Sequence, residues 1–152
     1  MAESSVISKT WAELTRDEWF EIARLRAEVF YVEQRIDEQE FDDADRAATT
    51  SHAWIADETG PIAYLRTVVD DEPQFRDARH SFGRVIVRHD HRGERLAQQL
   101  IDGVIASQGA EPMYLHAQSY IVPLYLKYGF TIFGDEYLEA GLPHILMYRP
   151  AS

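Results

Sequence analysis

Residues 85–101 read VIVRHDHRGERLAQQLI, and this stretch decides the fold. It predicts a buried strand over 82–87, a turn that contains Gly93, and an amphipathic helix over 94–108. The first turn of a helix leaves backbone N–H groups unpaired and carries roughly half a positive charge, so it attracts an anion such as phosphate. The formal net charge of the chain is −11, yet four arginines surround this turn: Arg84, Arg88, Arg92 and Arg95. The stretch therefore predicts an anion site at the helix start.

The turn lacks the glycine patterns of nucleotide-binding proteins, because the chain contains neither GxGxxG nor GxxxxGK(S/T). Residues 92–97, RGERLA, instead resemble the acyl-CoA loop of the GNAT superfamily of N-acetyltransferases, (Q/R)xxGx(G/A), which follows the fourth strand of that fold. Arg92 and Ala97 match the first and last positions, and Arg95 stands where the family most often has glycine. The resemblance implies a set of acetyl-CoA contacts: Val85, Ile86, Val87, Arg92, Gly93, Glu94, Arg95, Leu96, Ala97 and Tyr125.

A second motif, LYLKYGF at residues 124–130, resembles the (F/L)YxxxGF element of the same superfamily. Gly129 predicts the end of a short helix, and 130–133 reads as a buried strand. One predicted strand, 113–117, separates the two motifs, which is the order of elements in the superfamily. The resemblance implies an α/β protein of the GNAT fold, with a mixed, mostly antiparallel central sheet flanked by helices on both faces.

Three further segments narrow the resemblance. Residues 26–34 (RAEVFYVEQ), the acidic run 40–45 (EFDDAD) and residues 141–145 (GLPHI) resemble the ElaA-like branch of the superfamily. The likeness extends from about residue 26 to residue 147, so we expect a single GNAT N-acetyltransferase domain over 1–152.

Composition agrees with a single globular domain, since the chain has 152 residues of which 45% are hydrophobic. No window approaches the ~20 apolar residues of a membrane span, and the N-terminus lacks a signal pattern. We therefore expect a cytoplasmic protein without a membrane partner. The sequence leaves a monomer and a homodimer both open. A pI near 4.9 argues against nucleic acid, which binds surplus Lys and Arg, and favours cationic partners. The chain has no cysteine, which excludes disulfides and a cysteine acyl-enzyme.

The remaining elements follow from local patterns. Thr15 and Glu18 form a capping box, so a helix is expected to begin there. Glu58-Thr59-Gly60 predicts a hairpin turn between two strands. The other expected strands are 5–11, 51–57, 61–69 and 144–148, and 70–80 is expected to be a polar loop.

Acetyl transfer from a thioester to an amine requires a neutral nucleophile, a stabilised oxyanion and a proton for the departing thiolate. Without cysteine, direct attack in a ternary complex is favoured. The family resemblance implies that backbone N–H groups at or beside Val87 stabilise the oxyanion. Tyr125 is the expected general acid, because a phenol with a pKa of about 10 can protonate or hydrogen-bond a thiolate whose conjugate acid has a pKa of about 8.5. The alternative is a buried Tyr125 whose hydroxyl bonds the backbone.

The expected proton acceptor for the amine is Glu33. Arg26 and Glu33 are seven residues apart on one predicted helix, so they are expected to share a face beside Phe30. There Glu33 would accept a proton or bind the ammonium group, and Arg26 would help to bind the substrate. The alternative is an Arg26–Glu33 ion pair that only orients the end of the helix.

Polar residues on other predicted strands are further candidates. His52 opens the strand 51–57 and is either catalytic or a core histidine with satisfied nitrogens. Arg66 shares a strand face with Tyr64 and is a candidate for substrate binding. His144 either enters the site from the last strand or anchors a loop.

Two patterns resemble metal ligands but lack their geometry. His89-Asp90-His91 places alternate residues in a turn, where they seldom converge on one ion. Residues 42–45, DDAD, lack the spacing and the glycine of a calcium loop. We expect no metal, and we expect the acidic run to be a solvated loop that can attract an ammonium group.

The sequence predicts a GNAT-fold acetyltransferase that uses acetyl-CoA as co-substrate to modify a primary amine on a small molecule or a peptide. The alternative is a non-catalytic acyl-CoA-binding sensor or interaction module. Tyr125 favours the enzyme, whereas Arg95 at the usual glycine position favours the sensor.

Overall fold

The computed structural model describes residues 5–152, so residues 1–4 of the expected domain lie outside it. One seven-stranded sheet has the order β1-β2-β3-β4-β5-β7-β6. All neighbouring strands are antiparallel except β4 and β5, which are parallel. The strands are β1 (Ile7–Thr10), β2 (Ser51–Asp57), β3 (Gly60–Val69), β4 (His80–Val87), β5 (Met113–Gln118), β6 (Thr131–Glu139) and β7 (Leu142–Arg149).

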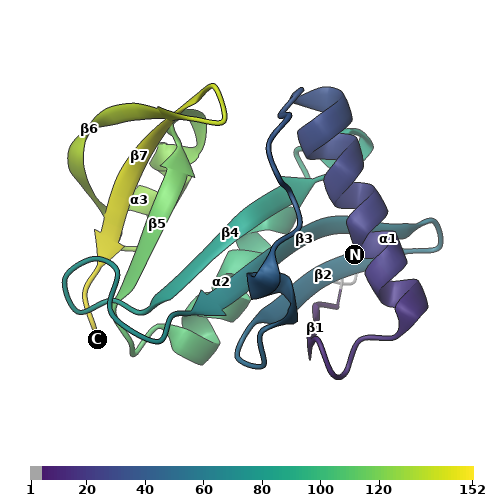
Figure 1. Cartoon of the computed structure of the whole chain (residues 1–152), viewed down its shortest axis with the longest axis horizontal. Helices are drawn as coiled ribbons and strands as arrows, with labels where there is room; N and C mark the ends of the chain where they lie inside the picture. Colours follow the sequence, from purple (N-terminus) through teal and green to yellow (C-terminus); the bar gives the residue numbers. More distant parts are fainter. Residues whose placement is uncertain (1–4) are drawn as a thin grey trace.

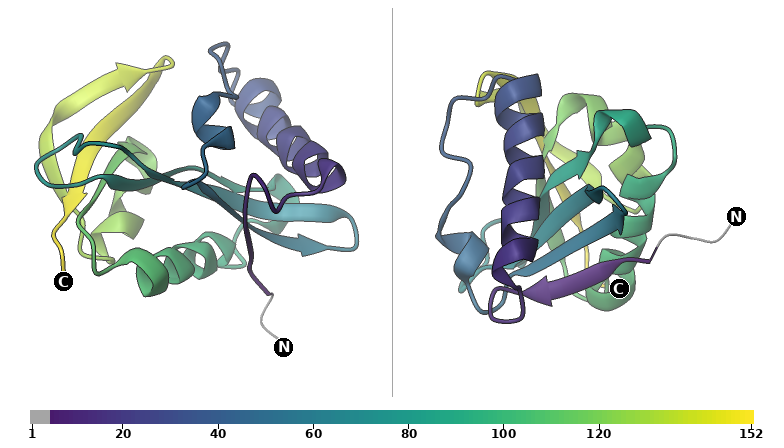
Figure 2. Two further views of the ribbon diagram at one scale, coloured as in Figure 1. Left: turned by 60° about the horizontal axis from the view of Figure 1, so that its bottom comes forward. Right: turned by 90° about the vertical axis from the view of Figure 1, so that its right-hand side faces the viewer.

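Helices cover both faces of the sheet. Helix α1 (Arg16–Arg26) lies over one face and α2 (Leu96–Gln108) over the other, as the views in Figures 1 and 2 show. A short helix, α3 (Val122–Leu126), follows β5. The expected mixed, mostly antiparallel sheet with helices on both faces is confirmed.

Helix α1 begins as its capping residues predict. The Glu18 N–H donates to the Thr15 hydroxyl at 3.0 Å, and the Thr15 N–H donates to the Glu18 carboxylate at 2.9 Å. The helix packs Ile22 and Leu25 against Trp54 of the sheet, which forms the core on this face.

After Arg26 the helix widens into a π-helix, η1 (Ala27–Glu33). The Gln34 N–H donates to the Val29 carbonyl at 2.9 Å, one residue further than in an α-helix. The wider turn rotates the following residues away from the α-helical register. Arg26 is therefore 0% exposed whereas Glu33 is exposed, and the expectation that they share a face is wrong.

Strands β4 and β5 pair only at His80–Met113 and Ser81–Tyr114. Beyond these pairs the two strands diverge (Figure 1). In the diverging part, the register between β3 and β4 shifts at Leu65, so that Arg84 and Val85 lie opposite one residue in a β-bulge. Arg84 has a φ of 53°, in the left-handed region. A bulge bends its strand and redirects a side chain, and this one lies where the sheet opens.

The C-terminal hairpin is longer than the sequence predicts. Strand β6 extends to Glu139 instead of ending at 133, and β7 begins at Leu142. The register shifts between Phe133 and Tyr137, and Gly134 has a φ of 78°. Because β6 is an edge strand and largely exposed, its second half carries polar residues and lacks the apolar alternation that marks a strand.

Candidate active site

The turn before α2, where the sequence predicts an anion site, is built around two residues with positive φ. Gly93 has a φ of 89°, and Arg95, the N-cap of α2, has a φ of 61°. A left-handed residue is needed at this cap, which explains why glycine suits the position. A cavity of about 270 Å³ lies here, lined by Val87, Arg92, Gly93 and residues 95–98. We call it the anion seat.

Two residues of the predicted acetyl-CoA contacts point elsewhere. The Glu94 carboxylate lies 3.0 Å from Nδ1 of His91 and does not line the anion seat. Ile86 is buried on the opposite face of the sheet, in the cluster that contains Trp54 and Tyr64.

The backbone of β4 offers donors to this gap. The Arg88 N–H donates to the Ile62 carbonyl of β3 at 2.8 Å. Because N–H directions alternate along a strand, the Val87 N–H points away from β3 and toward the gap. The Val87 carbonyl accepts a hydrogen bond from Arg92 Nε at 3.0 Å.

Arg92 also pairs with Glu33. Its Nη2 lies 2.7 Å from Glu33 Oε2, so the expected Arg26–Glu33 ion pair is replaced by one between η1 and the anion seat. Within residues 5–152, Glu33 lines neither of the two cavities described here.

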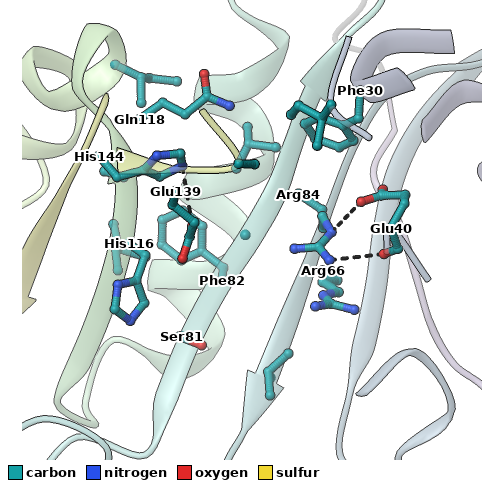
Figure 3. A pocket seen from close by; sticks show the side chains of 18 of the residues that line it. Phe30, Glu40, Arg66, Ser81, Phe82, Arg84, His116, Gln118, Glu139 and His144 are labelled. Carbon is teal, nitrogen blue, oxygen red and sulfur yellow. Dashed lines mark hydrogen bonds and ion pairs between the residues drawn. The ribbon is translucent and has the colours of Figure 1, made fainter. Parts of the chain in front are cut away.

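A second, larger cavity of about 430 Å³ opens where β4 and β5 diverge (Figure 3). We call it the amine cavity, after the substrate that the sequence predicts. Its apolar part includes Phe82, Leu115 and Tyr125. Arg84 and Glu40 lie on one side, and Glu139, His144 and His116 lie on the other, as Figure 3 shows.

Tyr125 lies in α3, is 4% exposed and lines the amine cavity. Its ring packs edge-on against Phe82, with centroids 5.6 Å apart. Among the residues that the structure describes, none accepts a hydrogen bond from its hydroxyl, so the alternative of a backbone-bonded hydroxyl is not found. Burial raises the pKa of Tyr125, which keeps the hydroxyl protonated.

Three arginines and three carboxylates form what we call the arginine–carboxylate cluster: Arg26, Arg66, Arg84, Glu40, Asp42 and Asp45. Arg26 bonds Asp45 and Glu40, each at 2.7 Å. Arg66 bonds Asp42 at 2.7 Å and Asp45 at 2.9 Å. These pairs hold the acidic run against the sheet. The run is thus not the solvated loop that the sequence predicts, because three of its carboxylates are neutralised by arginines from α1, β3 and β4.

The cluster shifts the pKa values of its carboxylates. The hydrogen bond from Arg66 lowers the pKa of Asp42 despite partial burial. Burial alone would raise the pKa of Asp45, but the hydrogen bond from Arg26 and the charges of Arg26 and Arg66 lower it overall. Both carboxylates are therefore ionised at neutral pH.

His52 belongs to this buried region and does not line the amine cavity. Its Nδ1 lies 2.6 Å from the Tyr64 hydroxyl and its Nε2 lies 2.9 Å from the Asp45 carbonyl. Burial lowers the pKa of His52. With both nitrogens engaged, His52 has the arrangement of a core histidine, the alternative to a catalytic role. Arg26 likewise lies behind the cavity wall, whereas Arg66 lines the cavity.

His144 lines the amine cavity, as a residue with a role in catalysis must. Its Nδ1 lies 2.8 Å from the Leu142 carbonyl, which can only accept, so Nδ1 carries the hydrogen. The other nitrogen, Nε2, lies 3.4 Å from Glu139 Oε2. Neutral His144 therefore presents an Nε2 lone pair close to the Glu139 carboxylate.

Several residues at the amine cavity were not identified as such from the sequence. Among them are His116, Glu139 and the side chain of Arg84. His116 gives a recognisable signal, a polar residue inside the buried strand 113–117, and its Nδ1 contacts the Tyr137 hydroxyl. Glu139 gives none, because it lies in the unpredicted half of β6.

Two negative observations apply to residues 5–152. No helix there is long and apolar enough to cross a membrane. No group of three or more His, Asp or Glu side chains in that range is arranged to hold a metal ion.

Comparisons with known proteins agree with this geometry. A family profile described as "Acetyltransferase (GNAT) domain" matches residues 16–149. The chain is 33% identical to the protein ElaA of Escherichia coli over 147 residues, 91% of each chain. It is 32% identical to a UPF0039 protein of Mycobacterium tuberculosis over 154 residues, 98% of this chain and 96% of that protein.

Two solved structures show the same fold over nearly full length. Escherichia coli ElaA has a TM-score of 0.86 at 30% identity and covers 97% of this chain and 99% of its own. An acyl-CoA N-acyltransferase from Pseudomonas aeruginosa has a TM-score of 0.81 at 32% identity, with 95% and 99% covered. The chain therefore belongs to the GNAT family of acetyltransferases, with ElaA and UPF0039 proteins among its relatives.

Proposed function

We propose that this protein transfers the acetyl group of acetyl-CoA to a primary amine by direct attack in a ternary complex. Membership of the GNAT family implies acyl-CoA binding. The observation that carries the rest is the position of Tyr125 in the cavity where β4 and β5 diverge, while the anion seat lies at the C-terminal end of the same strand β4.

The anion seat would bind the pyrophosphate of acetyl-CoA on backbone N–H groups between Gly93 and Ala97. Arg92 and Arg95 add positive charge at this helix start. The left-handed conformation of Arg95 preserves the turn that glycine would give, so this substitution no longer favours a non-catalytic sensor. The thioester carbonyl would then lie in the gap, near the Val87 N–H that faces it.

The chemical step needs one bond formed and one broken. The amine nitrogen attacks the thioester carbon, the C–N bond forms, and the oxyanion is stabilised by the N–H donors of β4. Collapse breaks the C–S bond and releases the thiolate of CoA. Because burial keeps Tyr125 protonated, its hydroxyl donates a hydrogen bond to this thiolate, which ends as the thiol after proton exchange with solvent.

The proton of the attacking amine would go to Nε2 of His144. That nitrogen has a lone pair by the tautomer argument, and Glu139 lies 3.4 Å away to stabilise the imidazolium. His144 therefore replaces Glu33 as our first candidate for the proton acceptor, because Glu33 is engaged by Arg92 outside the amine cavity.

The test is a screen for acetyl-CoA-dependent release of CoA with amino acids, polyamines, aminoglycosides and peptide N-termini. We expect turnover of at least one class. Calorimetry with acetyl-CoA serves as the control for binding. Tight binding of acetyl-CoA without turnover of any amine would contradict the proposal and support the sensor.

A further inference from the structure

We propose that the acceptor amine also carries a carboxylate, and that Arg84 binds this carboxylate in the amine cavity. The inference rests on the proposed function and specifies its substrate class. It would place an amino-acid-like molecule, rather than a polyamine, beside Tyr125 and His144.

Arg84 has a donor to spare. Its Nη2 donates to the Glu40 carbonyl at 3.0 Å and lies 3.7 Å from Asp42 Oδ2. Its Nε lies 2.7 Å from Glu40 Oε1, an ion pair without a well-directed hydrogen bond. Among residues 5–152, no partner bonds Nη1, and Figure 3 shows this end of the guanidinium pointing into the amine cavity.

The other arginines of the arginine–carboxylate cluster are committed. Arg26 is 0% exposed and lies behind the cavity wall, and Arg66 bonds two carboxylates. Arg84 differs because its side chain is 29% exposed. Its backbone explains this difference: the bulge, with a φ of 53°, directs the side chain out of the sheet and into the cavity.

The cavity is therefore polarised. One side offers the free end of a guanidinium, which stays charged at any physiological pH and has the planar geometry that suits a carboxylate. The opposite side offers Glu139 and His144, where an amine can lose its proton. Glu40 on the first side is already paired with Arg26 and Arg84, whereas Arg84 still has Nη1 unbonded within residues 5–152. Glu38 also lines the amine cavity, and it is exposed to solvent.

Matched substrates test the assignment. We would compare each of two sets of amino acids with its primary amides: ω-amino acids of about two to six carbons and common α-amino acids. Putrescine and spermidine would represent amines without a carboxylate. CoA release at saturating acetyl-CoA gives kcat/KM for each. The amine of an α-amino acid amide is less basic than that of the α-amino acid, so a larger fraction of it is unprotonated at neutral pH. Faster reaction of the α-amino acid must therefore come from binding of its carboxylate.

We expect the preferred carboxylate to exceed its amide by about 10- to 100-fold in kcat/KM, the range of a charge-assisted hydrogen bond. In Arg84→Gln this ratio should fall to about one, mainly through KM for the carboxylate. The matched control is Arg46→Gln, which removes a charge from the exposed Arg46–Asp43 pair at the end of the acidic run and should keep the ratio. Arg84→Lys keeps the charge and should retain part of the preference.

A binding measurement separates this inference from the proposed function. Calorimetry in the presence of CoA would compare each N-acetyl amino acid with its amide, which needs no turnover. If the carboxylates bind more tightly than the amides but no amine is acetylated, the proposed function is contradicted and the binding of a carboxylate by Arg84 is supported. Equal kcat/KM and equal binding for carboxylates and amides, or a preference for spermidine, would overturn the inference and leave the acetyltransferase standing. Acetyl-CoA affinity and melting temperature of Arg84→Gln check that the variant is folded.

Discussion

At the scale of single residues, Tyr125 has the sharpest expected effect. Tyr125→Phe keeps the packing against Phe82 and removes only the hydroxyl. We expect kcat to fall by ~10²- to 10⁴-fold, while acetyl-CoA affinity stays within a few-fold, since the hydroxyl matters only as the thiolate departs. Single-turnover kinetics and calorimetry would check this. An unchanged rate of the chemical step would remove Tyr125 from the mechanism.

His144→Gln is expected to lower kcat at neutral pH, because the amine then lacks its proton acceptor. An amine with a pKa of about 10.4 is mostly protonated at pH 7, and its neutral fraction grows as pH rises. The deficit of the variant should therefore shrink toward pH 10. His80→Gln is the control, since His80 bonds Gln108 and does not line the amine cavity. A deficit that stays constant with pH would point to a structural role.

Glu33→Gln should leave kcat and the KM for the amine unchanged. Glu33 lies outside the amine cavity, and its pair with Arg92 is exposed on both sides, so the pair contributes little stability. Acetyl-CoA should bind up to a few-fold more tightly, because a negative charge beside the anion seat is lost. A fall in kcat that disappears at high pH would restore Glu33 as proton acceptor.

Sequence reasoning placed single residues well only where local rules decide. Thr15 caps α1 as predicted, because the capping box involves neighbours in the chain. Arg26 and Glu33 were misjudged because the sequence 27–33 carries no obvious sign of a π-helix. The partners of Arg26 are 14 and 19 residues away, beyond the reach of any helical spacing.

At the scale of elements, the turn before α2 can be tested with two glycines. Gly93 has a φ of 89° and open space around it, so Gly93→Ala should cost about 1–2 kcal/mol from backbone strain alone and weaken acetyl-CoA binding. Gly103 also has open space but lies within α2 at an ordinary φ, so Gly103→Ala should stabilise by roughly 0.5–1 kcal/mol. Urea denaturation measures both. Equal effects would contradict the strained turn.

Element types follow from the sequence better than element ends. The strands around the first motif and both main helices are found where expected, because apolar period and capping residues mark them. The second half of β6 is missed, because an exposed edge strand shows no apolar face. The β4 bulge is also missed, since nothing in the sequence marks Arg84 as left-handed.

At the scale of the whole molecule, stability should fall with acid in two stages. Burial lowers the pKa of His52, so below about pH 6.5 the unfolded chain binds a proton that the folded chain does not, and the free energy of unfolding drops by up to about 1.4 kcal/mol per pH unit. The contributions of Asp42 and Asp45, whose pKa values are also lowered, are complete above about pH 3.9 and disappear as pH falls further.

Urea denaturation from pH 8 to pH 3 measures these stages, with His52→Gln as the comparison. The variant should be less stable at pH 8, because two hydrogen bonds are lost. Its dependence on pH between about 6.5 and 5 should be flatter than that of the parent protein. Parallel curves in this range would contradict the assignment to His52.

The amine cavity is a property of the whole molecule and was beyond sequence reasoning. Its walls come from β3, β4, β5, α3, the β6–β7 hairpin and the segment 36–40, which are distant in the chain. Tyr125 and His144 were found through motifs, but their meeting with Arg84 depends on how far the strands diverge.

That divergence has a mechanical consequence. Only two residue pairs join β4 and β5, so backbone pairing divides the sheet into two parts, β1 to β4 and β5 to β7. Helix α2 packs against β2, β3 and β4, and the core beneath it also contains Met113, Leu115 and Met147 of the other part. A co-substrate bound in the gap would contact both parts and restrain their relative motion. Amide hydrogens of β5 and β7 that touch no ligand should therefore exchange more slowly with solvent once acetyl-CoA is bound.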